Sequence, residues 1–414
     1  MGLHFIIKKE QMRRFNLKKF PVENKVVLLR VDYNVPLHNN KILDNTKIIA
    51  SLPTIKYLLS KNCQIIIATH LGNPKGKVVN ELKTDPLAKE LKKLLKVNVT
   101  KIDDCLGKEV KEKINKAKTT KIFFLENLRF YRAEEKNNHL FAHSLASLAD
   151  FYVNDAFAVS HRKHASIEAI THFLPSLAGF LLEKEIFYLN NALKPRRPVV
   201  WIMGGAKLDK VQLIKKILRK TDQILIGGAL AFSFLKAKGI KVGMSKVDSN
   251  SVSSAKKLLK KWSAKKIILP LDFIVSEKFS PQAKSKIVNY NQIKNNQIAL
   301  DLGPRTVELF KKQLSKANTI VWNGPLGYFE WAKYAFSTKA VGRFLGKLES
   351  VKICGGGETA EAVNKFHLAH NFTHLSTGGG ATLTFLAGNK LVGITALEKN
   401  YQKFRKKARL IRVI

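Results

Sequence analysis

The sequence predicts an α/β protein made of two doubly wound parallel-sheet (Rossmann-like) domains, joined by a helix and hinge into a bilobal molecule. The chain has 414 residues, and a typical domain size of about 150 residues makes two or three domains the expectation. Short continuous apolar runs alternate with longer segments in which apolar residues recur every three or four positions. This alternation is typical of strands buried on both faces of a parallel sheet and connected by helices.

The apolar runs that we expect to be strands form two series along the chain. The first series is 25–34, 64–70, 121–128 and 150–157. The second series is 198–205, 223–228, 266–273, 297–303, 319–325, 351–357 and 374–380. Segments such as NTKIIASLPTIKYLLSK and KVQLIKKILRK lie between them and have the apolar spacing of a helix.

The first series ends near residue 175, and the segment 177–193 that follows has the pattern of a helix. KPRRP then interrupts this pattern with two prolines before the second series begins. We therefore expect a boundary here. The expected parts are an N-terminal domain 1–176, completed by the C-terminal tail 396–414, a connecting helix and hinge 177–197, and a second domain 198–395.

Composition excludes several classes of protein. A hydrophobic fraction of 45% excludes a wholly disordered chain, and no apolar run approaches the roughly 18 residues of a membrane span. The three cysteines are far apart, which excludes a cysteine-rich zinc module and favours a reducing, cytoplasmic location. A net charge of +42 attracts anions of every kind, including nucleic acids, acidic membranes and phosphorylated metabolites.

Ligands of doubly wound sheets bind outside the carboxyl ends of the strands. In the first series, the residues at these ends are mainly cationic or polar: Arg30, Asp32, Asn34, His70, Arg129, Asn154, Asp155 and, shortly afterwards, Arg162. Arginine forms paired hydrogen bonds with phosphate and carboxylate groups, so this set favours a small, highly anionic ligand. Each residue alone also has a structural interpretation; Asp32, for example, could simply orient Arg30.

In the second series, the corresponding positions are mostly glycines that open helices. They are Gly204, Gly205, Lys207, Gly227, Gly228, Asp272, Asn323, Gly355, Gly356, Gly357, Gly378, Gly379 and Gly380. Helix N-termini expose backbone N–H groups that bind nucleotide phosphates. A single glycine pair after a strand is usually only a tight turn, so the interpretation depends on the whole ordered set. We interpret His161 and His164 as structural, because no further metal ligands lie near them in the sequence.

Nine motifs occur in an order that resembles the phosphoglycerate kinase family. They are RVDYNVP, DNTKIIASLPTI, THLGNPKG, ENLRFY, YVNDAFAVSHRKHAS, GGAK, WNGPLGYFE, GGGETA and STGGGA. The resemblance extends over about residues 11 to 396. It implies a two-domain monomer that transfers phosphate between 1,3-bisphosphoglycerate and MgADP, giving 3-phosphoglycerate and MgATP after hinge closure.

The resemblance also implies roles for individual residues. The phosphoglycerate would contact Arg30, Asp32, Asn34, Lys47, His70, Arg129 and Arg162. The nucleotide would contact Gly205, Lys207, Lys210, Gly227, Gly228, Asn323, Glu330, Gly355, Gly356, Gly357, Glu358 and Thr359. The catalytic set would be Arg30, Lys47, Lys207, Lys210 and Gly357. Glu358 would hold Mg²⁺ directly or through water.

The implied chemistry requires no general base, because the carboxylate and the ADP phosphate are both ionised at pH 7. The sequence also contains no convincing nucleophile–base pair and no Walker-type phosphate loop. Phosphoryl transfer then depends on alignment, exclusion of water and neutralisation of charge.

Four positions depart from the family pattern. Lys47 and Asn73 stand where the family has arginines, and we hypothesise that Lys75 or Lys77 partly replaces the second of these cations. Lys207 and Lys210 are three residues apart instead of four, which still leaves both on one helical face. Glu358 replaces an aspartate linked to Mg²⁺. The added methylene matters because Mg²⁺ tolerates little distortion.

Two alternatives stay open at this point. The net charge and the basic tail would also suit a nucleic-acid binder that has kept a kinase fold, although the lysines form no concentrated stripe with interleaved aromatic residues. We therefore expect no specific nucleic-acid partner and no membrane partner. Lys47 and Asn73 would also suit an inactive paralogue, but most other site residues of the family are retained.

Overall fold

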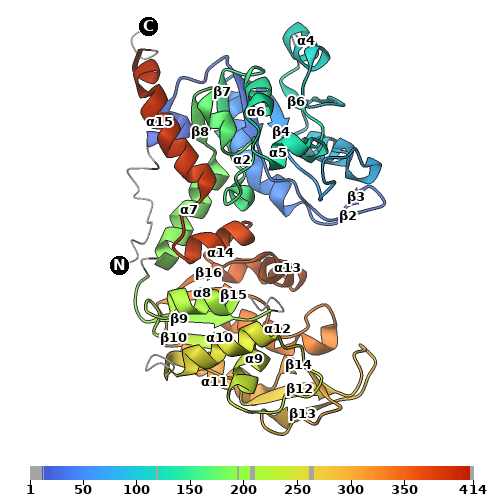
Figure 1. The fold of residues 1–414 in the computed structure, drawn as a ribbon, viewed down its shortest axis with the longest axis vertical. Helices are drawn as coiled ribbons and strands as arrows, with labels where there is room; N and C mark the ends of the chain where they lie inside the picture. Colours follow the sequence, from blue (N-terminus) through green and yellow to red (C-terminus); the bar gives the residue numbers. More distant parts are fainter. Residues whose placement is uncertain are drawn as a thin grey trace. The chain divides into compact units, whose positions relative to one another are not determined.

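A computed structural model of the chain describes residues 12, 14–117, 120–193, 195–205, 210–260 and 265–410, with the backbone alone for 405–410. The described residues fold into two compact units (Figure 1). Unit 1 contains the residues up to Phe187 and those from Lys390 onward, and unit 2 contains Tyr188–Asn389. The division falls inside the helix α7 (Phe180–Leu193).

Unit 1 is built on a six-stranded parallel sheet with the order β5-β6-β4-β1-β7-β8. Its strands are β1 (Val26–Arg30), β4 (Gln64–Ala68), β5 (Val99–Lys101), β6 (Ile122–Phe124), β7 (Phe151–Asn154) and β8 (Ser176–Ala178). β1 pairs with β4 on one side and with β7 on the other. The winding reverses between β1 and β7, so this is the topological switch point where a ligand site is expected.

Helices and a small hairpin complete unit 1. The hairpin is β2 (Leu37–His38) with β3 (Lys41–Ile42). The helices are α2 (Thr46–Ser60), α3 (Asp85–Leu95), α4 (Lys108–Lys116), α5 (Arg132–Glu135), α6 (His139–Ala146) and α15 (Val392–Leu410). Short 3-10 helices are η1 (Leu17–Lys19), η2 (Asn80–Leu82), η3 (Leu128–Phe130), η4 (Phe157–Val159) and η5 (Ala169–His172).

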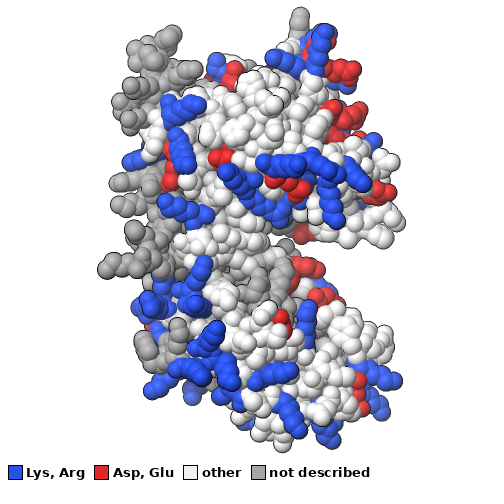
Figure 2. Space-filling model, in the orientation of Figure 1, with Lys and Arg blue, Asp and Glu red and all other residues white. Residues whose placement is uncertain are grey.

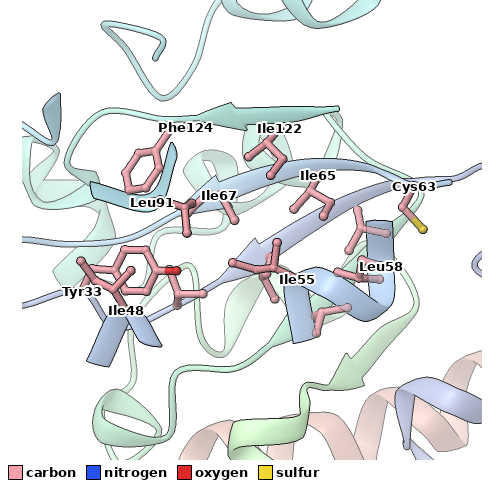
Figure 3. Packing of buried hydrophobic residues seen from close by; sticks show 14 of the residues in the cluster. Tyr33, Ile48, Ile55, Leu58, Cys63, Ile65, Ile67, Leu91, Ile122 and Phe124 are labelled. Atoms are coloured by element: carbon pink, nitrogen blue, oxygen red, sulfur yellow. The ribbon is translucent and has the colours of Figure 1, made fainter. Parts of the chain in front are cut away.

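The sheet of unit 1 has a hydrophobic core on each face. On one face, Leu29 and Ile67 belong to the same buried cluster as Ile55 of α2, as Figure 3 shows for part of this cluster. On the other face, Leu28 and Ile66 belong to a cluster that includes residues of α4 and α6. Successive strand residues point to opposite faces. A sheet covered on both faces therefore explains why these strands are continuous apolar runs.

Unit 2 is built on a second six-stranded parallel sheet, with the order β11-β10-β9-β15-β16-β17. Its strands are β9 (Val199–Met203), β10 (Gln223–Ile226), β11 (Ile267–Ile268), β15 (Thr319–Asn323), β16 (Val351–Cys354) and β17 (His374–Leu375). Numbered along the chain within the sheet, this order is that of the dinucleotide-binding fold, with its switch point between β9 and β15. The predicted fold class, α/β with two parallel sheets, is confirmed.

Two predicted strands of the second series differ from expectation: only the beginning of the run 266–273 belongs to this parallel sheet, and the run 297–303 lies outside it. The run 266–273 contains β11 and the beginning of β12 (Asp272–Ser276), separated by Pro270. β12 pairs antiparallel with β13 (Ser285–Asn289) and with β14 (Ile298–Leu302), which is the run 297–303. Apolar runs indicate burial, but they do not show which strand lies alongside or in which direction it runs.

Asp272 therefore starts a strand and is not at a ligand-facing end. Its carboxylate accepts hydrogen bonds from the backbone N–H groups of Arg305 (3.1 Å) and Thr306 (2.8 Å). The Thr306 hydroxyl also donates to it at 2.6 Å. Asp272 thus holds the first turn of α11 (Pro304–Leu314), which is a structural role.

The remaining helices of unit 2 cover its sheets. They are α8 (Lys210–Ile217), α9 (Leu230–Ala237), α10 (Ser249–Leu259), α12 (Phe336–Leu345), α13 (Gly357–Lys365) and α14 (Gly380–Leu386). The 3-10 helices are η7 (Ala332–Tyr334) and η8 (Ala369–Asn371).

The helix predicted over 177–193 begins later than expected, at Phe180, because Leu177 and Ala178 belong to β8. Asp155 holds its start: Oδ1 accepts hydrogen bonds from the N–H groups of Leu181 (2.8 Å) and Leu182 (3.2 Å). Burial raises the pKa of this carboxyl to about 6, against the lowering effect of those hydrogen bonds. Asp155, which directly follows β7, therefore binds the first turn of α7 instead of an external ligand.

The C-terminal segment is the helix α15, and it packs on unit 1. Asn400 is buried and accepts a hydrogen bond from the Ser176 N–H at 2.9 Å. Its amide also donates to the carbonyls of Thr171 (2.6 Å) and Leu174 (2.9 Å). Because all three partners lie just before or at the start of β8, the end of the chain completes unit 1.

The surface of the molecule carries many cations. Figure 2 shows Lys and Arg side chains spread over both units on the visible face, with no single concentrated stripe. None of the described helices combines the length and apolar character of a bilayer span. On this face the cations are therefore distributed over the surface.

Candidate functional site

Arg30 ends β1 at the switch point of the unit 1 sheet, and three contacts hold its guanidinium. It is 1% exposed. Nε donates to Ser166 Oγ at 2.8 Å, Nη1 donates to the Val31 carbonyl, and Nη2 lies 3.2 Å from His70 Nδ1. The strand end and these contacts together fix where the positive charge lies.

A buried carboxylate, that of Glu134, is connected to Arg30 through Ser166. Glu134 is fully buried and accepts hydrogen bonds from Ser166 Oγ (2.6 Å) and Ser166 N (2.9 Å). Ser166 therefore links the Arg30 guanidinium to a compensating negative charge. Sequence reasoning missed Glu134, since it lies in α5 and away from any strand end.

Asp32, Asn34 and Lys47 form one hydrogen-bonded group beside Arg30. Lys47 Nζ donates to Asp32 Oδ2 at 2.8 Å and to the Asn34 carbonyl at 3.1 Å. Burial alone would raise the pKa of the Asp32 carboxyl, but the Lys47 ammonium, with a contribution from Arg30, holds it below its usual value. Asp32 therefore stays ionised and positions the Lys47 ammonium at the start of α2.

His70 is neutral in this arrangement. Burial lowers its pKa well below the usual value, and the charges of Arg30 and Arg129 add to this effect against the opposing charge of Asp32. A neutral imidazole whose Nδ1 accepts from Arg30 carries its proton on Nε2. His70 thus offers one hydrogen-bond donor and no additional charge.

The Arg129 guanidinium has a hydrogen-bond donor that is not used by any described residue. Its Nη1 donates to the Gly72 carbonyl at 2.8 Å, and Nε lies 3.4 Å from Glu135 Oε1. Nη2 is buried and has no hydrogen-bond partner among the described residues. Buried donors are almost always satisfied, so an unpaired guanidinium nitrogen at the end of a sheet indicates a place for an anionic ligand.

The predicted cations of unit 1 lie close enough to interact. Burial, followed by the charges of Arg162 and Arg30, lowers the pKa of Arg129. Burial, followed by the charges of Arg129, Arg30 and Arg162, lowers the pKa of His164 to about 3. Arg162 is exposed. This concentration of positive charge is suited to a small molecule with several negative charges.

The loop with Asn73, Lys75 and Lys77 lies against the Arg129 segment. Gly76 donates its N–H to the Arg129 carbonyl at 3.1 Å, and a Cβ on Gly76 would lie 1.9 Å from Arg132 Cγ. Lys75 and Lys77 are the exposed neighbours of this anchored glycine. This geometry is consistent with our hypothesis that Lys75 and Lys77 supply positive charge near Asn73.

For 3-phosphoglycerate, the substrate that the family resemblance implies, we expect the double variant Lys75→Ala/Lys77→Ala to raise KM about three- to tenfold with kcat nearly unchanged, because two nearby but exposed cations are lost. Steady-state kinetics in the direction of ATP consumption measure both constants. Lys89→Ala/Lys93→Ala, which removes two exposed lysines of α3, is the matched control. An unchanged KM in the first variant would reject the hypothesis.

In unit 2, two glycine turns meet at the switch point between β9 and β15. Gly204 N–H donates to the Asn323 carbonyl at 2.9 Å, and Gly205 N–H donates to the Pro325 carbonyl at 2.7 Å. Gly205 has φ +80, and a Cβ there would lie 2.9 Å from both Glu358 Oε2 and Lys210 Nζ. Only glycine leaves the space that these two charged groups share.

The N-terminus of α13 faces open space. Gly357 begins this helix, and a Cβ on it would meet nothing within 4 Å. Asn323 and Thr359 brace the turn: Asn323 Nδ2 donates to the Gly355 carbonyl at 2.7 Å, and Thr359 Oγ1 accepts from the Gly324 N–H at 2.6 Å. The exposed N–H groups of such a turn can bind phosphate oxygens.

Lys210 is the first residue of α8 and is 5% exposed. Its ammonium donates to the Gly204 carbonyl at 2.8 Å and lies near the Glu358 carboxylate, as the position of Gly205 shows. Lys207, which the resemblance placed in the same site, lies outside the described residues.

A cavity of about 450 Å³ lies next to these turns. Of the predicted nucleotide residues, Gly205, Gly228, Glu330 and Glu358 line it. Gly227 is not one of the lining residues, and a Cβ on it would lie 2.5 Å from Leu326 Cδ2. The cavity is walled by side chains that sequence reasoning missed: Phe232, Phe273, Phe279, Leu302, Tyr328 and Phe329. Phe279, Tyr328 and Trp331 also contact each other. A flat apolar slot beside glycine turns suits a purine base.

Asp301 is a buried acid in the wall of this cavity. Ser337 donates both its N–H (3.2 Å) and its hydroxyl to the carboxyl group. Burial raises the pKa of Asp301 to about 7, although these hydrogen bonds act in the opposite direction. Asp301 therefore gains its charge near neutral pH, inside a mostly apolar pocket.

We expect Asp301→Asn to change how stability depends on pH. An acid whose pKa is higher in the folded state contributes stability that is complete below its unfolded pKa of about 4 and is lost as pH rises through about 7. The Tm of the wild type should therefore fall relative to that of the variant between pH 5 and pH 8. Scanning calorimetry across this range checks the result, and parallel curves for the two proteins would contradict it.

Comparisons with known proteins agree on one family. The family model described as phosphoglycerate kinase matches residues 17–389. The chain is 46% identical to a phosphoglycerate kinase of Moorella thermoacetica, over 93% of this chain and 99% of that protein. It is 43% identical to one of Pseudothermotoga lettingae, over 93% of this chain and 99% of that protein.

Solved structures give the same result. The chain is similar to phosphoglycerate kinase from Coxiella burnetii, with a TM-score of 0.81 and 35% identity over 93% of this chain and 98% of that one. It is also similar to the enzyme from Pyrococcus horikoshii, with a TM-score of 0.85 and 33% identity over 94% of this chain and 100% of that one.

Proposed function

The chain belongs to the phosphoglycerate kinase family, and from this premise we propose that unit 1 binds the phosphoglycerate and unit 2 binds the adenine nucleotide. It is a kinase of glycolysis, an enzyme that transfers phosphate. The reaction is the reversible transfer of a phosphoryl group from 1,3-bisphosphoglycerate to ADP, giving 3-phosphoglycerate and ATP.

The observation that carries the assignment of unit 1 is the unpaired nitrogen of Arg129 beside a group of fixed cations. Arg30, Arg129 and Arg162 would bind the phosphate and carboxylate oxygens of the substrate. His70, with its proton on Nε2, and Asn34 would supply neutral hydrogen bonds that set orientation. The ionised Asp32 carboxylate would repel an anionic substrate, so its proposed role is to position Lys47.

The assignment of unit 2 is supported by the cavity and by the turns around it. The base would occupy the slot between Gly205, Gly228 and the aromatic wall, with Glu330 at the ribose. The phosphates would then extend toward the N-terminus of α13, past Lys210 and Gly357.

Transfer requires no proton abstraction by the protein. A β-phosphate oxygen of ADP attacks the phosphorus of the acyl phosphate, and the bond between that phosphorus and the carboxyl oxygen breaks in line with the attack. The released carboxylate keeps the electron pair. Lys47, Arg30, Lys210 and the Gly357 N–H neutralise charge on the moving group, and Lys207 is assigned the same role by family resemblance alone.

The residues present fit a magnesium ion carried by the nucleotide. The Glu358 carboxylate is a hard oxygen ligand, lines the cavity and approaches Gly205, beside the path proposed for the phosphates. Glu358 would hold the ion directly or through water. When bound, Mg²⁺ would neutralise phosphate charge in addition to the lysines.

Two further features belong to the same proposal. Because the two ligands are assigned to different units, a hinge movement would have to bring them together before transfer. We expect a monomer in the cytoplasm, in line with cysteines that are all free and buried.

A coupled assay of the purified chain with 1,3-bisphosphoglycerate, ADP and Mg²⁺ tests the function. We expect ATP formation that requires all three, and nucleotide binding by calorimetry in the low-millimolar range or tighter. Binding of both substrates without turnover would identify an inactive paralogue instead. A failure to bind either substrate would reject the assignment of the two units.

A further inference from the structure

Two histidines and a glutamate gather on unit 1, at a place that the kinase reaction does not use. They are His139, the first residue of α6, Glu168, which precedes η5, and His172, which ends η5. One ligand atom from each residue lies within 4.8 Å of the other two. The histidines are exposed and Glu168 is half-buried, so the group is open to solvent.

The separations match those of ligands that share one small metal ion. His172 Nε2 lies 3.3 Å from Glu168 Oε1. Two ligands at 2.0–2.2 Å from a tetrahedral zinc ion are roughly 3.3 Å apart. The ring centres of His139 and His172 are 5.2 Å apart, and two imidazoles on one tetrahedral ion have their centres about 5 Å apart. All three ligand atoms lie within 4.8 Å of one another, so side-chain rotations would have to bring the more widely spaced atoms closer around one ion.

The carboxylate of this group is already oriented by a neighbour. Asn137 Nδ2 donates to Glu168 Oε2 at 2.6 Å, while Asn137 Oδ1 accepts from the Ala169 N–H at 3.2 Å. The outer oxygen of Glu168 is therefore occupied, and Oε1 is the one that lies at His172. In metal sites, a ligating carboxylate is commonly fixed by such a second hydrogen bond.

We propose that His139, Glu168 and His172 form a binding site for a Zn²⁺ ion or a similar divalent transition-metal ion, with water at the fourth position. Two imidazole nitrogens and one carboxylate are a known ligand set for zinc. The same set disfavours Mg²⁺ and Ca²⁺, which prefer oxygen ligands throughout. The site is thus distinct in chemistry from the proposed nucleotide-linked magnesium at Glu358.

A bound ion would fasten two elements of unit 1 to each other. His139 is the first residue of α6, Glu168 precedes η5 and His172 ends η5. η5 is in turn held to α15, because Lys403 Nζ donates to the His172 carbonyl at 2.9 Å and Asn400 Nδ2 donates to the Thr171 carbonyl at 2.6 Å. The ion would therefore stabilise the docking place of the C-terminal helix and leave the substrate residues untouched.

The test is calorimetric titration of the full chain, without an affinity tag and after removal of metals, using Zn²⁺ alone and Mg²⁺ alone. We expect one Zn²⁺ per chain at roughly micromolar Kd and no competition by Mg²⁺ at this site. His139→Ala and His172→Ala should each weaken Zn²⁺ binding at least about tenfold, and Asn137→Gly, which tolerates the positive φ at this position, about tenfold. A hundredfold excess of Zn²⁺ over Kd should raise the Tm of the wild type by roughly 5–10 °C.

His143→Ala is the matched control, because it removes an exposed histidine one turn further along α6, whose ring packs on Phe173. It should bind Zn²⁺ like the wild type. Unchanged kinase activity in His139→Ala and His172→Ala would show that these variants are folded. The proposal is overturned if the wild type shows no saturable Zn²⁺ binding, if the double variant His139→Ala/His172→Ala binds equally well, or if His143→Ala loses as much affinity as His139→Ala.

Discussion

Replacing Lys47 with alanine is expected to lower kcat at least about a hundredfold. The Lys47 ammonium lies at the start of α2 and is held by Asp32 Oδ2 at 2.8 Å and by the Asn34 carbonyl at 3.1 Å. Two of its three N–H groups are thereby used, and the third is available to the transferring phosphoryl group. Loss of one preorganised donor to developing charge typically costs 10²–10³ in kcat.

Steady-state kinetics in both directions measure this effect. Lys56→Ala removes an exposed lysine from the same helix and should change kcat less than about twofold. If Lys47→Ala behaves like Lys56→Ala, the catalytic role assigned to Lys47 is wrong. The Tm of Lys47→Ala must also be measured, since Asp32 loses its main partner and a buried carboxylate is left less compensated.

Lys47→Arg separates charge from geometry at the same position. A planar guanidinium can give two parallel hydrogen bonds to a phosphoryl group, whereas an ammonium acts as a point charge. A higher kcat in Lys47→Arg than in the wild type would support the view that lysine here limits turnover. A lower kcat would show that the Asp32–Lys47 pair is adapted to the shorter, more flexible cation.

Replacing Lys210 with methionine is expected to lower kcat about 10²–10³-fold, with a smaller loss of ADP affinity. The ammonium is buried, donates to the Gly204 carbonyl at 2.8 Å, and lies beside Gly205 and the Glu358 carboxylate. Methionine keeps most of the volume and the apolar contacts of the stem but removes the charge and its donors. The charge should matter most when negative charge moves between the two substrates.

Lys215→Met, at an exposed position of the same helix, is the matched control for Lys210→Met. ADP binding by calorimetry and kcat by the coupled assay separate binding from transfer. Equal losses in Kd and in kcat/KM, with kcat unchanged, would mean that Lys210 only binds the nucleotide. A drop in kcat with near-normal ADP binding is the expected result.

Much of the fold could be predicted because apolar runs report burial directly. Runs such as VVLLR and QIIIA are continuous because their sheet is covered on both faces, and they became β1 and β4 as expected. The ends of those strands also carried the site residues of unit 1. Arg30, Asp32, Asn34, Lys47 and His70 lie in one connected group, although their roles toward substrate stay predictions.

Other features could not be read from local pattern. The runs at β12 and β14 look like those of the parallel sheet, yet these two strands pair antiparallel with each other, and β12 also pairs with β13, in a separate sheet. Glu134 supports Arg30 from more than one hundred positions away in the sequence, through Ser166. The aromatic wall of the cavity comes from a helix, a strand and loops, and its residues show no common spacing.

The amino-acid order by itself determined the family, the α/β class and which polar and glycine residues follow the strand ends, because each of these depends on short motifs or on the period of burial. Tertiary structure decided which strands became neighbours, which buried acid lines the apolar cavity of unit 2, and that His139 meets Glu168 and His172. Contacts of this second kind join residues far apart along the chain, and they depend on how separate helices and sheets pack. No local periodicity encodes that packing.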